Sequence, residues 1–203
     1  MAERFYLGLW LRDHDGSNML SHFRVLLESF PYSQTHPRLR GVRVYPLSWT
    51  EHPVLEEDFA EEGAELEHGL RLASDFLHDD YAYEAEAFWD LWIFQKNGGP
   101  GAWKVAPRLV RLLCHGPGFE EGAQNQGDLT VDFGLDTPFR AAEEPSDPRA
   151  RVVTIDHRDR LKGNIEKLLE FVRVVNERLP VEKKLIWTES GENFAELIQR
   201  SFR

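Results

Sequence analysis

The stretch Tyr83–Phe94, YEAEAFWDLWIF, decides the fold. Its odd-numbered positions are apolar or aromatic throughout, whereas Glu84, Glu86 and Asp90 occupy three of the even-numbered positions. Such period-two alternation is typical of a half-buried β-strand. The spacing therefore predicts one long strand, whose two-faced character changes near Trp92, where both faces become apolar.

Strand-like segments follow this stretch without an intervening helix. Gly98-Gly99-Pro100-Gly101 is a cluster of turn residues, and the apolar run 103–114 predicts a hairpin partner, in which Pro107 marks either a bulge or an edge. Residues 129–135 alternate clearly between apolar and polar positions, which predicts a third consecutive strand. Consecutive strands of this kind favour antiparallel pairing.

Working outward, further elements can be placed on both sides. Residues 5–11 are apolar on both parities, which is typical of a central strand covered on both faces. Further strands are predicted at 41–47, 151–155 and 185–187, and helices from the Asp15–Ser17 turn to Pro31, over 66–77, over 161–179 and from Ser190 onward. The predicted fold class is α+β, with helices packed on a mixed, largely antiparallel β-sheet.

Length and composition favour one domain over residues 1–203. The proline-containing connection 136–150 leaves open a second arrangement, in which residues 150–203 form a small βαβα unit. The single cysteine, Cys114, excludes an intramolecular disulfide, and neither a signal peptide nor an apolar run of membrane-spanning length is present. We therefore expect a cytoplasmic protein that does not contact a membrane.

The negative charge is concentrated in one segment. The net charge is −11, and residues 51–86 contain 13 acidic residues and one basic residue, Arg71. A field of this sign repels phosphate backbones, so a nucleic-acid ligand is not expected. The basic cluster 149–162 is diluted by Asp156 and Asp159.

The leading hypothesis is a non-catalytic binding protein that presents residues 51–90 to a basic protein, as a bacterial toxin-neutralising or adaptor protein would. The candidate partner-binding residues are an aromatic side chain in a loop and seven carboxylates: Trp49, Glu56, Glu57, Glu61, Glu62, Glu65, Glu84 and Glu86. Two other interpretations of Glu84 and Glu86 are a solvated sheet face and a catalytic carboxylate pair. Trp49 is either an anchor for the partner or a staple under its own loop. A structural subunit kept soluble by its acidic segment is a further alternative.

The enzymatic alternative depends on the Asp13-His14-Asp15 turn. Histidine and carboxylate side chains are metal ligands, so this turn could serve a metal-dependent hydrolase. Partners would have to come from His36, His52 or the Asp156-His157 pair. The competing interpretation is a turn in which an aspartate caps the next helix. The sequence contains no phosphate-binding loop, dinucleotide fingerprint, zinc-protease motif or nucleophile elbow, so no cofactor is predicted.

Overall fold

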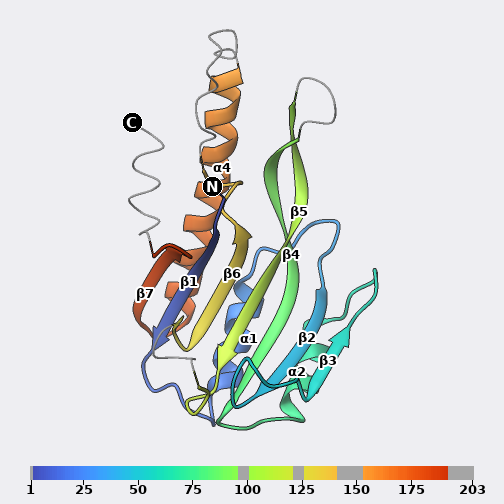
Figure 1. Cartoon of the computed structure of the whole chain (residues 1–203), viewed down its shortest axis with the longest axis vertical. Coiled ribbons are helices and arrows are strands. Elements are labelled where there is room, and N and C mark those ends of the chain that lie inside the picture. Colours follow the sequence, from blue (N-terminus) through green and yellow to red (C-terminus); the bar gives the residue numbers. More distant parts are fainter. Residues whose placement is uncertain (1, 96–100, 121–125, 141–152, 192–203) are drawn as a thin grey trace.

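The strands of the protein form one antiparallel sheet. The computed structural model describes residues 2–95, 101–120, 126–140 and 153–191. Within these residues the strand order is β3-β2-β4-β5-β6-β1-β7, and every recorded pairing is antiparallel (Figure 1). The strands are β1 (Arg4–Leu11), β2 (Leu39–Pro46), β3 (Leu55–Asp58), β4 (Tyr81–Gln95), β5 (Ala102–His115), β6 (Leu129–Leu135) and β7 (Val181–Thr188).

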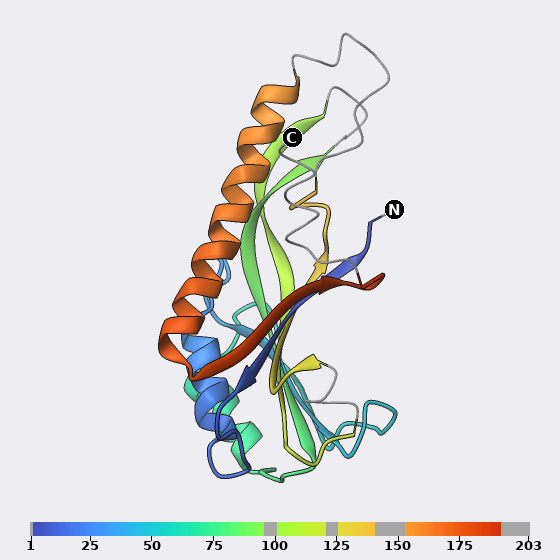
Figure 2. The same ribbon diagram turned by 90° about the vertical axis from the view of Figure 1, so that its left-hand side faces the viewer.

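Three helices pack on this sheet, which confirms the predicted α+β class. They are α1 (Met19–Ser29), α2 (Leu66–Ser74) and α4 (Val153–Arg178), and Figure 2 shows them on the same side of the sheet. Their apolar faces supply buried residues such as Phe23, Leu70 and Leu168. Apolar residues spaced three and four apart face the sheet together, as expected for amphipathic helices.

The core is built around Trp89 of β4, which is 1% exposed. Its ring lies 5.7 Å from the ring of Phe133 and 6.0 Å from that of Phe30, measured between centroids. Phe171 of α4 lies 6.1 Å away. Aromatic side chains from two strands and from the helical layer therefore meet at one point, where burial of large apolar surfaces stabilises the contact between the layers.

Two predictions about strands are borne out by the described pairings. The long strand and its hairpin partner form one continuous register from Ala82↔His115 to Gln95↔Ala102. Pro107 interrupts nothing in that register, and the recorded pairing of β5 with β6 begins only at Arg111. Pro107, which has no N–H to donate, therefore lies where β5 is paired on one side only among the described strands. Of the two predicted alternatives, a bulge or an edge, the structure shows the edge.

One strand was not predicted, and one other prediction was wrong. No element was predicted at residues 55–58, whose sequence LEED forms β3. β3 exists because β2 supplies its hydrogen-bonding partner, and the charged side chains carry no apolar alternation that would reveal it. A strand was predicted at 151–155, whereas residues 153–155 begin α4. A short apolar run does not distinguish a strand from a helix. The helix predicted from Ser190 falls largely on residues 192–203, outside the described residues.

The carboxy-terminal strand β7 pairs with β1 in the same sheet, with Leu7 opposite Ile186. The single-domain arrangement and the alternative unit 150–203 both stay predictions. No helix in the described ranges combines the length and the apolar character that crossing a membrane requires. The cytoplasmic location stays a prediction.

Strand β4 continues beyond the end of its neighbour β2, and other groups complete its backbone hydrogen bonds there. The pairing with β2 ends at Ala87. Further along, the Phe88 carbonyl accepts from the N–H of Ser33 at 2.7 Å, and the Asp90 carbonyl accepts from Lys167 Nζ at 2.9 Å. At Trp92, the side-chain amide of Asn164 in α4 makes the two backbone hydrogen bonds that a residue of a neighbouring strand would make.

Asn164 is fully buried and makes three hydrogen bonds to backbone groups. Its Oδ1 accepts from the Trp92 N–H at 2.9 Å, and its Nδ2 donates to the Trp92 carbonyl at 2.9 Å. The same Nδ2 donates to the Pro138 carbonyl at 2.6 Å. One amide therefore joins α4 to the edge of β4 and to the segment that follows β6.

We expect Asn164→Ala to lower the free energy of unfolding by about 2–4 kcal/mol, because the partner groups at Trp92 and Pro138 lose their bonds inside the protein. Chemical denaturation followed by tryptophan fluorescence measures this change. The control is Asn176→Ala, which removes an exposed contact with Lys184 and should cost less than about 0.5 kcal/mol. Equal losses in the two variants would contradict the role assigned to Asn164.

Candidate functional site

A group of exposed carboxylates lies at the β3 end of the sheet. We define the acidic edge as six exposed carboxylates on β3, on the turn after it and at the start of α2: Glu56, Glu57, Asp58, Glu61, Glu62 and Glu65. β3 is the outermost strand on this side, and its recorded pairing is with β2 alone among the described strands (Figure 1). Its side chains therefore have no further strand beside them.

Only part of the acidic edge is neutralised by described cations. Arg43 lies 2.9 Å from Glu56 and 3.0 Å from Asp58, measured between nitrogen and oxygen. Glu65 pairs with Arg38 at 2.8 Å. The remaining three carboxylates, Glu57, Glu61 and Glu62, have no ion pair with any described residue. The acidic edge therefore keeps uncompensated negative charge at its surface.

Glu84 and Glu86, unlike the acidic edge, are buried, and they lie on β4 across β2 from β3. Both come from β4 and are 5% and 7% exposed. Register places Arg43 directly opposite Glu84, and its Nη1 lies 3.2 Å from Glu84 and 3.1 Å from Glu86. Arg111 of β5, which stands opposite Glu86, approaches that carboxylate to 3.3 Å. These two predicted partner-binding residues are therefore buried beneath arginines, and Arg43 links them to Glu56 and Asp58 of the acidic edge.

The electrostatics of this buried network explain why the arginine is needed. Burial raises the pKa of Glu84, the charge of Glu86 adds to that shift, and Arg111 and Arg43 oppose it. Burial disfavours the charge of Arg43, but its hydrogen bond with Glu56 and the charges of Glu86 and Glu84 together raise its pKa. One guanidinium therefore compensates two buried carboxylates and two of the acidic edge.

Trp49 is half-buried and contacts three aromatic rings. The ring centroids of Tyr45 and Phe119 each lie 5.0 Å from its own, and that of His115 lies 5.8 Å away. These contacts join the loop after β2 to the end of β5 and the turn that follows. These ring contacts are the ones expected if Trp49 holds its own loop against the sheet. The alternative, that Trp49 contacts a protein partner, stays a prediction, since part of the ring is exposed.

His115, beneath Trp49, is completely buried. Its Nδ1 lies 2.8 Å from the Gly127 carbonyl, and its Nε2 has no hydrogen-bond partner among the described residues. Burial lowers the pKa of His115 to about 4, against an opposing contribution from the bond to Gly127. The imidazole is therefore neutral at neutral pH and stays inside the fold.

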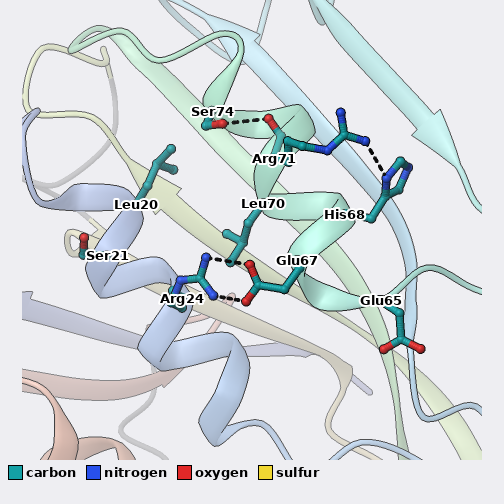
Figure 3. A pocket seen from close by; sticks show the side chains of 9 residues that line it. All are labelled: Leu20, Ser21, Arg24, Glu65, Glu67, His68, Leu70, Arg71 and Ser74. Atoms are coloured by element: carbon teal, nitrogen blue, oxygen red, sulfur yellow. Dashed lines mark hydrogen bonds and ion pairs between the residues drawn. The ribbon is translucent and has the colours of Figure 1, made fainter.

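A groove of about 720 Å³ lies between α1 and α2, next to the acidic edge (Figure 3). Arg24 bridges the helices by a two-point ion pair with Glu67, one arm of which is 2.9 Å long. Arg71 donates to His68 Nδ1 at 2.9 Å. Arg24 and Glu67 thus pair within the groove, whereas Glu65, which also belongs to the acidic edge, pairs with Arg38 outside it.

The Asp13-His14-Asp15 turn has two distinct parts. Asp15 Oδ1 accepts hydrogen bonds from the N–H groups of Ser17 and Asn18 at 2.8 and 3.2 Å, within the turn that precedes α1. The N-cap residue of α1 is Asn18, and no side chain donates or accepts a capping hydrogen bond there. Asp13 is exposed and has a left-handed backbone with φ of 57°. Asp15 therefore stabilises the turn, as the competing interpretation held, but the helix cap that this interpretation assigned to an aspartate is not formed.

His14 faces a residue that the sequence analysis did not single out. Its Nδ1 lies 3.2 Å from Nδ1 of His22 in α1. Of the partners that were considered, His36 contacts Phe88, and His157 contacts Phe94 and Trp103. His52 is exposed, and the side chain of Asp156 lies outside the described part of the chain. The eight-residue separation between His14 and His22 matches no metal-binding motif, so no sequence signal marked the pair.

The hydrolase hypothesis stays a prediction. Among the described residues there is no group of three or more histidine, cysteine, aspartate or glutamate side chains that could hold a metal ion.

We expect Arg43→Met to lower the free energy of unfolding by about 2–4 kcal/mol at pH 7, because Glu84 and Glu86 would keep buried charges without their principal partner. In the folded variant the pKa of Glu84 would rise further above its unfolded value. Its contribution to stability is then fully present below the unfolded pKa and is lost as the pH rises through the folded pKa. The deficit measured by urea denaturation should therefore be smaller at about pH 4.5 than at pH 7.

The matched control for this prediction is Arg173→Met, because Arg173 also contacts two carboxylates but is 55% exposed. Solvent screens such pairs, so we expect a small loss that does not change between the two pH values. A deficit in the Arg43→Met variant that is independent of pH would contradict the assigned role of Arg43.

Comparisons with known proteins give no match. No protein-family model matches the chain, and neither does any curated protein or any solved structure. The function must therefore be inferred from the charge, burial and contacts of the described residues.

Proposed function

We propose that the chain is a non-catalytic binding protein whose acidic edge contacts a basic surface of a protein partner, as in a toxin-neutralising or adaptor protein. The observation that supports this proposal is the exposure of all six carboxylates of the acidic edge on one end of the sheet. Glu57, Glu61 and Glu62 have no ion pair with a described residue, so a partner's lysine or arginine side chains would not have to displace a cation from them.

The acidic edge is also held in place before a partner arrives. β3 is hydrogen-bonded to β2, and the Leu39–Ala64 bridge fixes the end of the turn that carries Glu61 and Glu62. α2 packs on β2, with Gly69 seated against Leu39. A surface whose backbone is already ordered loses less conformational entropy on binding than a flexible acidic tail does.

Exposed charge at such an edge mainly affects the association rate and the choice of partner. Complementary fields raise the association rate and suppress partners of the same sign. Exposed ion pairs contribute little energy singly, so the proposal rests on several carboxylates acting together. Glu84 and Glu86 support the surface from within, because the arginine that covers them also holds Glu56 and Asp58.

The test compares capture by the wild-type chain with capture by Glu57→Gln, Glu61→Gln and Glu62→Gln combined. We expect the wild type to retain a basic protein from a lysate of its source at about 50 mM salt and to release it at about 500 mM, since salt screens exposed charges. With the captured protein purified, the triple variant should bind it about tenfold more weakly, from about 0.5 kcal/mol for each of three exposed pairs.

A control variant removes equal charge at a distance from the acidic edge. Asp159→Asn, Glu166→Gln and Glu182→Gln change three exposed carboxylates on α4 and β7, and affinity should stay at the wild-type value. Equal weakening by both triple variants would show a response to total charge and would contradict a local site. Capture that is insensitive to salt would contradict the proposal as well.

A further inference from the structure

Two half-buried histidines meet where the turn after β1 enters α1. His14 lies in the turn, and His22 lies in the first turns of the helix. Their rings are close to parallel, at 21°, with centroids 5.5 Å apart. The Nδ1 atoms are 3.2 Å apart, so both nitrogens face the same small volume.

The other ring nitrogen of His14 identifies its tautomer. Nε2 lies 2.9 Å from the backbone carbonyl oxygen of His115, which can only accept a hydrogen bond. Nε2 therefore carries the proton, and in the neutral ring Nδ1 of His14 is a free lone pair directed toward His22. Histidines that bind metals usually donate their second ring N–H to a carbonyl or carboxylate in the same way.

The separation of the two Nδ1 atoms matches that of two ligands on one metal ion. With Zn–N bonds of about 2.0–2.1 Å, two nitrogens on a tetrahedral ion lie about 3.3 Å apart. Without an ion, the 3.2 Å contact is a hydrogen bond in which His22 donates to His14. A bound ion replaces that shared proton, which moves to Nε2 of His22, so the neutral pair binds the ion without net proton release.

The surrounding charges favour an ion at this place. The carboxylates of Asp128 and Asp15 lie close enough to His22 for their negative charge to act on its ring. Gly16 belongs to the same turn as His14, and the carboxylate of Asp79 packs directly against this glycine. Both histidines are partly exposed, so an ion can enter from solvent.

We propose that His14 and His22 form a two-histidine site for a divalent transition-metal ion, with solvent completing the coordination shell. Imidazole ligands suit zinc, copper and nickel. The described residues supply no group of three or more ligands, so the ion keeps positions open for exchange. The site is separate from the acidic edge and does not depend on the proposed binding function.

The experiment titrates tag-free full-length protein with zinc chloride and follows its thermal unfolding. Binding to the folded state alone raises the midpoint by about 5–11 °C at a zinc concentration 100 times the dissociation constant. His22→Gln should lose most of this shift. The matched control is His68→Gln on α2, an exposed histidine that hydrogen-bonds to Arg71, and it should keep the shift.

A second measurement uses only the wild type, because His22→Gln could also weaken the fold. Electron paramagnetic resonance with one equivalent of copper(II) should show coupling to two imidazole nitrogens at near-neutral pH. Absence of both the thermal shift and the two-nitrogen signal would overturn the proposal and leave the pair as a hydrogen bond. A shift lost equally in both histidine variants would overturn it too.

Discussion

The rest of the structure depends on the backbone hydrogen bonds of β4. A buried N–H or carbonyl without a partner costs free energy comparable to a lost hydrogen bond, so a 15-residue strand inside a sheet needs partners along both edges. β5 supplies one edge over the whole strand, whereas β2 supplies the other only as far as Ala87. Beyond Ala87, Ser33 and Lys167 donate to the carbonyls of β4, and Asn164 bonds to both backbone groups of Trp92. Meeting this requirement positions α4 and the segment before β2, and with them the aromatic core around Trp89.

Charge is organised by the same sheet. Register brings Arg43 between β3 and β4, so that one guanidinium faces carboxylates on both neighbouring strands. On the β4 side it compensates Glu84 and Glu86, which solvent hardly reaches; on the β3 side it holds Glu56 and Asp58 at the surface. The acidic segment of the chain therefore divides into two structurally different groups of carboxylates. One part is a buried ion-pair network that supports the sheet, and the other is a surface.

Sequence patterns found the elements whose burial alternates regularly. The long hairpin, the strand 129–135 and the amphipathic helices α1 and α2 are visible because one face of each is apolar. β3 was missed because its four residues carry no such pattern, and residues 153–155 were misassigned because β-branched residues in a short run are compatible with either element. For the candidate site, the five glutamates between 56 and 65 were identified from their density, while Asp58, Arg43 and His22 were not.

The α+β class and the concentration of negative charge in residues 51–86 could be predicted from the sequence, because periodicity and charge are local properties of a chain. Only the tertiary structure decided which carboxylates are buried and which remain exposed, since that depends on strand register across the sheet. It also decided that His14 meets His22 and that Asn164 completes β4. These contacts join residues whose positions along the chain carry no shared pattern, and folding alone brings them within hydrogen-bonding distance.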